Sequence, residues 1–173
     1  MTENPAQPQH FTGLILLTGT DAPGIATSLF ETLAPFAVHL IDIEQVVINA
    51  RLILTVLIGA NPAHQKAIED DLGSCATALD VDIATIFAKT DIKMVPQRLL
   101  KVVVASVKLH PKALALVTNS ITNSGANIES FSRISDDPTT IAITTSGVPQ
   151  EDLDLALSSV IFEDETTVSL SVS

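Results

Sequence analysis

The most constraining feature of this sequence is that its second half resembles its first. A shift of 88 residues, the distance from Pro23 to Pro111, places apolar residues of one half on apolar residues of the other. The coinciding pairs are Leu29 with Val117, Leu33 with Ile121, Leu40 with Ile128, Ile43 with Phe131, and Val46 with Ile134. Self-similarity at one fixed distance indicates a structural unit that is used more than once. A chain of 173 residues is therefore expected to fold as two small domains.

Each half predicts the same order of elements, β-α-β-β-α-β, from apolar runs of strand length and apolar positions at helical spacing. In the first half we expect strands at 11–18, 39–49, 52–60 and 81–88, a helix at 25–36 that Pro35 ends or kinks, and a helix at 61–79. In the second half we expect strands at 99–107, 127–135, 140–145 and 166–173, a helix through Ala113 and Ile121 that Gly125 caps, and a helix at 151–162. The expected organisation is a disordered leader at 1–10, a first domain at 11–88, a linker at 89–98 and a second domain at 99–173.

Composition and charge narrow the range of partners. Hydrophobic residues make up 46% of the chain and aromatic residues 3%, so the apolar surface is mostly aliphatic. Small domains rarely cover that much apolar surface alone, and we expect a homo-oligomer. The formal net charge of −11 repels phosphate backbones and anionic lipids, which argues against nucleic acid and membrane partners. Cys75, the single cysteine, fits a cytoplasmic protein and is predicted to be a buried helix residue rather than a nucleophile.

The loop at residues 19–24, Gly-Thr-Asp-Ala-Pro-Gly, is the first candidate binding site. A strand that turns sharply into a helix leaves backbone N–H groups at the helix start without partners, and these groups attract a carboxylate. Gly24 has no side chain that would block a ligand, and the Asp21 carboxylate can receive an ammonium group. The loop therefore suits both charged ends of an amino acid. The alternative is that Asp21 is simply a helix cap and Gly24 a turn residue.

Two longer stretches resemble a known family. The stretch TGTDAPGIATSLFETLAPFAVHLIDIEQVVINARLILTVLI is similar to the first ACT domain of actinobacterial-type phosphoserine phosphatases, and SGANIESFSRISDDP resembles the same region of their second ACT domain. The resemblance extends from about Phe11 to Ser173. It implies an α+β fold of two ferredoxin-like βαββαβ (ACT) domains, each an antiparallel sheet with helices on one face. It also implies that ACT domains pair side by side and hold an amino-acid effector, L-serine in this family, between a loop and the neighbouring domain.

The resemblance assigns site residues position by position. The first loop matches the family at Asp21 and Gly24, and Ile25 and Ala26 supply the amides that follow. Asn127 matches an asparagine that faces a partner's loop in ACT pairs, and its side chain can both donate and accept hydrogen bonds. The alternative for Asn127 is a structural role in a turn.

The second loop departs from the family pattern. Lys112 stands where a glycine would allow a ligand to approach, and Leu109 stands where the first loop has Asp21. His39 occupies the position in the first half that Asn127 occupies in the second. One site, formed by the first loop and Asn127, is therefore predicted to bind, and the other is predicted to be lost.

No catalytic or metal-binding residue is expected in this chain. The resemblance implies that a phosphatase domain of the haloacid dehalogenase type, with an Asp-x-Asp-x-Thr nucleophile motif and Mg²⁺, follows the ACT pair in family members. The Asp-x-Asp stretches that begin at Asp80 and Asp152 lack that context, since one precedes a strand and the other lies in a helix. The four histidines are scattered and do not have metal-ligand spacing. We therefore expect no cofactor here, and Mg²⁺ only for a phosphatase domain that the sequence does not contain.

Three functions remain open from the sequence. The first is the N-terminal regulatory part of a phosphoserine phosphatase of L-serine biosynthesis, without its catalytic domain. The second is a free-standing tandem ACT regulator of the glycine-cleavage repressor type, which acts by protein–protein contact. The third is a dimerisation module whose loop binds nothing.

Overall fold

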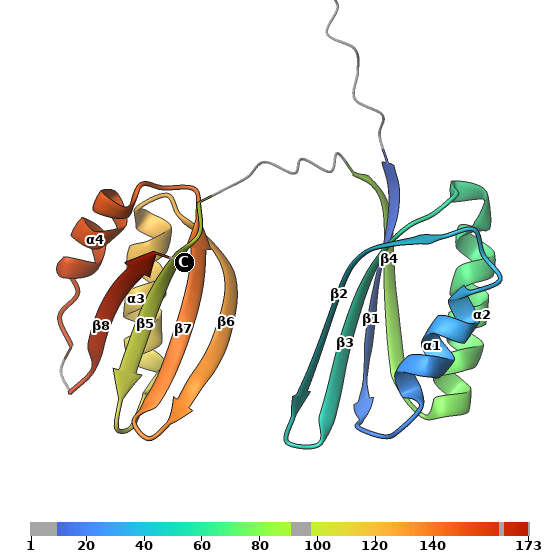
Figure 1. Ribbon diagram of the computed structural model, residues 1–173, viewed down its shortest axis with the longest axis horizontal. Coiled ribbons are helices and arrows are strands. Elements are labelled where there is room, and N and C mark those ends of the chain that lie inside the picture. Colours follow the sequence, from blue (N-terminus) through green and yellow to red (C-terminus); the bar gives the residue numbers. More distant parts are fainter. Residues whose placement is uncertain (1–9, 91–97, 163–164, 173) are drawn as a thin grey trace, which may run out of the picture. The chain divides into compact units, whose positions relative to one another are not determined.

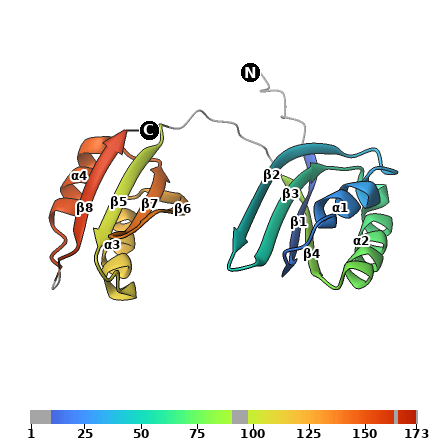
Figure 2. The ribbon, with the colours of Figure 1, turned by 60° about the horizontal axis from the view of Figure 1, so that its bottom comes forward.

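The computed structural model describes residues 10–90, 98–162 and 165–172, and it divides into two compact units between residues 93 and 94. Each unit contains one four-stranded antiparallel sheet with two helices on one of its faces (Figures 1 and 2). The element order is the same in both units. The predicted α+β architecture of two βαββαβ domains is confirmed.

In the first unit the strands follow the order β2-β3-β1-β4 across the sheet. Its elements are β1 (His10–Thr20), α1 (Ile25–Leu33), β2 (His39–Ile48), β3 (Arg51–Gly59), the 3-10 helix η1 (Pro62–His64), α2 (Gln65–Leu79) and β4 (Asp82–Thr90). Asn61 caps η1, since its side-chain oxygen accepts a hydrogen bond from the Ala63 amide at 3.0 Å. The chain thus forms a 3-10 turn before α2, where the sequence predicts a single helix at 61–79.

The second unit repeats the arrangement with the strand order β6-β7-β5-β8. Its elements are β5 (Leu100–Ser106), α3 (Pro111–Asn123), β6 (Asn127–Asp136), β7 (Thr139–Ser146), α4 (Gln150–Ser158) and β8 (Thr167–Val172). Gly125 follows α3 with φ +89°, the left-handed angle that commonly ends a helix. The predicted glycine at the end of this helix is confirmed.

Each core lies between the sheet and its two helices. Alternate residues of a strand point to opposite faces, so Ile15 and Leu17 of β1 face the helices and are fully buried. Leu29 and Leu33, one turn apart on α1, and Leu72 of α2 pack against them. In the second unit the equivalent packing joins the helix-facing residues of β5 to α3, through Val102, Val104, Val117 and Ile121.

Two helices end earlier than the hydrophobic periodicity predicts. α1 stops at Leu33, with Ala34 as its cap, so it ends before Pro35 rather than running to residue 36. α4 stops at Ser158 rather than at 162. The Ser158 and Ser159 hydroxyls donate to backbone carbonyls of the last turn, at 2.7 Å each. Serine hydroxyls that bond to carbonyls of the last turn accompany this helix end, and apolar spacing alone does not reveal them.

The connections differ slightly from the predicted ones. The hairpin between β2 and β3 is a two-residue turn, in which Asn49 and Ala50 have φ values of 48° and 59°, and Arg51 already pairs with Ile48. β4 continues to Thr90, into the first residues of the predicted linker, and residues 91–97 lie outside the described part. The predicted leader also lies outside it, apart from His10, which begins β1.

Cys75 is buried on α2, as predicted. Of the helices in the described residues, none combines the length and the apolar character that a membrane crossing requires.

Candidate functional site

The loop between β1 and α1 places a glycine in the left-handed region of backbone conformation. Gly24 has φ +92° and is the N-cap of α1. A Cβ built on Gly24 would meet no heavy atom of the described residues within 4 Å. Glycine is therefore favoured here by its backbone angle, while the space beside it is open. A ligand atom can occupy the volume that a side chain would otherwise fill.

The first turn of α1 provides backbone N–H groups that have no helical partner. The Ser28 amide donates to the Gly24 carbonyl at 2.9 Å, the first hydrogen bond of the helix. The amides of Ile25, Ala26 and Thr27 precede that bond, so no carbonyl of the helix can pair with them. The Ile25 side chain is buried in the core, and this residue offers only its amide. Three donors at the positive end of a helix dipole suit a carboxylate.

Asp21 lies exposed at the start of the loop and is fixed through its backbone. Its amide donates to the Ala50 carbonyl at 2.9 Å, which ties the loop to the turn of the β2–β3 hairpin. Within the described residues no side chain caps α1, so the alternative that Asp21 is a helix cap is wrong. The carboxylate is exposed and accessible to a cationic group.

A hollow of about 360 Å³ lies beside the loop, near the lower end of the usual size range of ligand pockets. It is lined by residues 21–24, Ala26 and Thr27, together with Gln45 of β2 and Leu52 of β3. Sequence reasoning missed Thr27, Gln45 and Leu52. Gln45 could have been noticed in the sequence, because it interrupts an alternating apolar pattern between Ile43 and Val47. These three residues lie on the face of β2 whose partners on β3 are buried.

The start of α3 in the second unit is built differently. Its N-cap is His110, whose Nδ1 accepts a hydrogen bond from the Lys112 amide at 3.2 Å. Pro111, at the first helical position, has no N–H group, and the Ala113 amide donates to the His110 carbonyl at 3.0 Å. None of the first three positions of α3 therefore offers a free backbone N–H group as α1 does, because two of these amides already donate to His110 and the third position is a proline.

Asn127 is the first residue of β6 and is exposed. Its side-chain amide donates to the Glu129 carboxylate at 2.8 Å, and the Ser146 hydroxyl donates to the same carboxylate oxygen. The hydrogen bonds from Ser146 and Asn127 lower the pKa of Glu129, because they favour its charged form. This contact fixes the Asn127 side chain by its donor group, and its carbonyl oxygen can still accept.

His39 occupies the topologically equivalent position, as the first residue of β2. It pairs with Gly59 across the hairpin, and its ring lies where a side chain of Gly59 would be. The first unit therefore has an imidazole packed on a glycine at the position where the second unit has the shorter side-chain amide of Asn127. The two units differ at this position in the structure as well as in the sequence.

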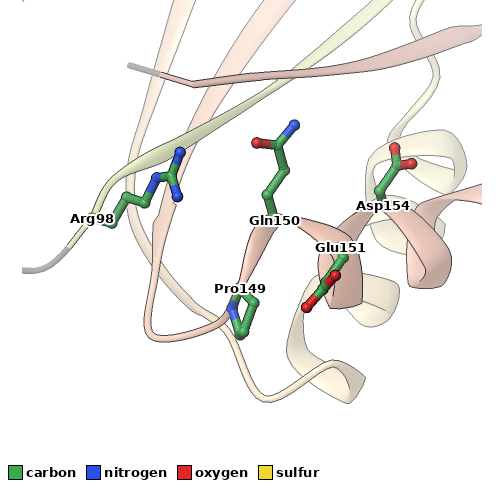
Figure 3. A pocket seen from close by; sticks show the side chains of 5 residues that line it. All are labelled: Arg98, Pro149, Gln150, Glu151 and Asp154. Carbon is green, nitrogen blue, oxygen red and sulfur yellow. The ribbon is translucent and has the colours of Figure 1, made fainter.

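Other hollows also occur among the described residues. One of about 520 Å³ is lined by residues near the start of β2, including Phe11, His39 and Lys89. Another, of about 510 Å³, lies between Arg98 and the first turns of α4, which carry Gln150, Glu151 and Asp154 (Figure 3). The acidic residues of that helix start offset its dipole, so the second hollow suits a carboxylate less well than the start of α1 does.

A metal site needs several ligating side chains close together. In the described residues, no group of three or more His, Cys, Asp or Glu side chains lies close enough together to hold a metal ion.

Comparisons with known proteins match the first unit to a family and about three quarters of the chain to curated relatives. The family model of the ACT domain matches residues 12–85. A phosphoserine phosphatase of Mycobacterium tuberculosis is 33% identical over 136 residues, and one of Streptomyces coelicolor is 34% identical over 131 residues. These alignments cover 77% and 73% of this chain but only 33% and 31% of the relatives. The chain therefore spans about a third of the length of the curated relatives it matches.

Two solved structures share the fold over both units. A candidate transcriptional repressor of the glycine cleavage system has a TM-score of 0.74 at 18% identity, with 93% of this chain and 96% of that chain covered. A protein of undescribed role from Galdieria sulphuraria has a TM-score of 0.73 at 18% identity, with 94% and 98% covered. Likeness at this level of identity establishes the architecture.

Proposed function

The first unit of this chain matches the ACT domain family and the second unit repeats its fold, and from that premise we propose that the chain is a tandem ACT module that regulates by binding L-serine. The ligand carboxylate accepts hydrogen bonds from the amides of Ile25, Ala26 and Thr27 at the start of α1. Its ammonium group pairs with the Asp21 carboxylate. Gln45 closes the hollow from the side of β2.

The observation that carries this proposal is the contrast between the starts of α1 and α3. The same fold occurs twice, so packing alone would allow the same helix start in both units. Only the first combines a left-handed glycine beside open space with amides that have no helical partner. In the second, a histidine cap and a proline remove the donors. A purely structural loop has no need of this difference.

The second half of the proposed site comes from another ACT domain. β2 and β6 are edge strands, and Ile43 and Phe131 on them are 49% and 55% exposed. Edge strands that pair side by side cover such residues and satisfy the unpaired backbone groups. In antiparallel pairing the start of one strand lies beside the end of the other. Asn127, at the start of β6, then lies beside the end of β2, where the hairpin turn holds the Asp21 loop.

The relatives support a proposal for the regulated activity. We propose that the chain corresponds to the regulatory part of a cytoplasmic phosphoserine phosphatase of L-serine biosynthesis, whose catalytic domain would use Mg²⁺. Removal of phosphate from phosphoserine yields serine, so an L-serine site gives regulation by the reaction product. The ACT tandem itself supplies binding and not phosphate transfer.

A second candidate is a free-standing tandem ACT regulator that acts through protein–protein contact. It is favoured by the fold likeness to the candidate glycine cleavage repressor, which extends over 96% of that chain. The two functions differ in their dependence on ligand chemistry. A serine site predicts preference for a small hydroxyl-bearing amino acid, whereas a repressor of glycine cleavage predicts preference for glycine.

Isothermal titration of the full chain with L-serine, glycine, L-alanine and D-serine tests the proposal. L-serine is expected to bind best, because its carboxylate, ammonium and hydroxyl groups all find polar partners in the hollow. D-serine is the matched control, since it has the same groups in the wrong arrangement. Absence of heat with every amino acid would exclude the binding function, and stronger binding of glycine would favour the second candidate.

A further inference from the structure

The helix-free faces of the two sheets differ in chemistry. In the first unit, one cross-strand row of this face runs from Asp42 on the edge strand β2 through Leu57 and Leu14 to Ile86 on β4. The exposed fractions of Leu14 and Ile86 are 42% and 67%, and Leu16, on the same face, is 39% exposed. Val46 and Ile53 extend this surface toward β2 and are 40% and 36% exposed. We define Leu14, Leu16, Val46, Ile53, Leu57 and Ile86 as the aliphatic face.

The corresponding surface of the second unit is small and polar. Its middle row consists of Ala142, Val103 and Ser169, and the next row consists of Thr144, Lys101 and Ser171. One fold therefore carries an apolar helix-free face in its first copy and a hydroxyl-rich face in its second. Because the cores of both units lie on the opposite face, folding of a single unit does not require this difference.

Charge restricts what can cover the aliphatic face. The central strands contribute the uncharged Leu57, Leu14 and Leu16, while the carboxylates lie at the borders of the face, with Asp42 and Glu44 on the edge strand β2 and Asp82 at the start of β4. This distribution, an apolar centre with charges at the rim, is typical of a protein interface. The helix-free face of the second unit is a poor complement, because it would bury Lys101 and several hydroxyls without partners. The same face of another copy is apolar at its centre and is therefore a good complement.

The size of the face is sufficient for such contact. Strands of nine residues at about 3.4 Å per residue and four strands at about 4.8 Å spacing give a face of about 30 by 19 Å. Two such faces together bury on the order of 1,100 Å², close to the lower end of stable protein interfaces. Sheets packed face to face in proteins reach this contact with their inner faces about 10 Å apart.

We propose that the aliphatic face is a self-association surface, at which two copies of this chain pack sheet against sheet across a two-fold axis. The contact is separate from edge pairing of β2 and β6, because it uses the broad face of the sheet. It leaves the helices and the start of α1 uncovered.

Light scattering of the full chain at micromolar concentration tests this surface. Leu14→Asp places a charge in the middle of the aliphatic face and is expected to halve the molar mass of the assembly. Val103→Asp is the matched control, since it places the same charge in the middle of the other helix-free face, and it is expected to leave the mass unchanged. A mass for the unmodified chain equal to one copy, or the same response to both substitutions, would overturn the proposal.

A second variant guards against loss of folding. Ile86→Lys changes the most exposed residue of the aliphatic face, whose contribution to the core is small. It is expected to halve the mass while the far-ultraviolet circular dichroism spectrum and the thermal midpoint stay close to those of the unmodified chain. A folded Ile86→Lys variant with unchanged mass would also overturn the proposal.

Discussion

Gly24 and Gly125 share a left-handed backbone angle, with φ +92° and +89°, yet only Gly24 lies at the proposed ligand site. Replacing either with alanine introduces similar strain, about 1–2 kcal/mol. Gly24→Ala also projects a Cβ into open space beside the loop, where we place the ligand. We expect Gly24→Ala to weaken L-serine binding about tenfold or more, which corresponds to about 1.4 kcal/mol.

Gly125→Ala is the matched control for this change. It is expected to lower the thermal midpoint by a similar amount and to weaken L-serine binding much less than Gly24→Ala does, because no ligand atom is placed beside Gly125. Titration calorimetry and thermal unfolding of both variants check the prediction. Equal losses of affinity would mean that backbone strain, and not the occupied ligand space, explains the effect.

Asn127 and Ser146 allow a second test at the residue scale, because both donate to Glu129. Removal of either donor is expected to raise the pKa of Glu129 toward its ordinary value, and Ser146→Ala should raise it more because that bond contributes most to the lowering. Asn127→Ala should in addition weaken L-serine binding by about 1–3 kcal/mol, the cost of a polar partner left unpaired. Carboxyl titration by NMR and calorimetry on both variants separate the two effects. If Ser146→Ala weakens binding as much, the pKa of Glu129 rather than Asn127 itself governs the site.

At the scale of elements, the starts of α1 and α3 set the difference between the two units. Lys112→Gly restores the family glycine at α3, but the His110 cap and Pro111 remain. We therefore expect Lys112→Gly to leave both the affinity and the stoichiometry of L-serine binding unchanged in calorimetry. A second binding event in this variant would show that Lys112 alone blocks the second loop.

The order of the elements could be predicted from the sequence because packing against a sheet imposes regular apolar spacing. Leu29 and Leu33 on α1, for example, and Val117 and Ile121 on α3 show that spacing directly. The ends of helices could not be predicted as well, since side-chain hydroxyls and caps decide them. The end of α4 at Ser158 rather than at 162 is one case, and the end of α1 at Leu33 rather than at 36 is another.

The candidate site was predictable where one continuous segment forms it. Asp21 and Gly24 are close in sequence, and the strand-loop-helix pattern indicates what their backbone does. Gln45 and Leu52 reach the same hollow from β2 and β3, and their approach depends on the hairpin and on the hydrogen bond between the Asp21 amide and the Ala50 carbonyl. Those contacts arise from register, which the sequence specifies only indirectly.

At the scale of the whole molecule, composition predicted an aliphatic surplus without locating it. Part of that surplus lies on the helix-free face of the first unit, which includes Leu14 and Ile86, and part lies on the edge strands β2 and β6. The two surfaces suit two different contacts, one sheet against sheet and one edge to edge. An assembly that uses both would carry the ligand sites at its edge contacts.

The central claim is that the start of α1 binds an amino acid and the start of α3 does not. The most direct measurement is a titration of the uniformly ¹⁵N-labelled full chain with L-serine, followed through its backbone amide signals. We predict progressive shifts of the Ile25, Ala26 and Thr27 amides, while the Lys112 and Ala113 amides stay in place. Shifts at the start of α3 of the same size as those at α1, or no shift at α1 when saturating L-serine is present, would contradict the account.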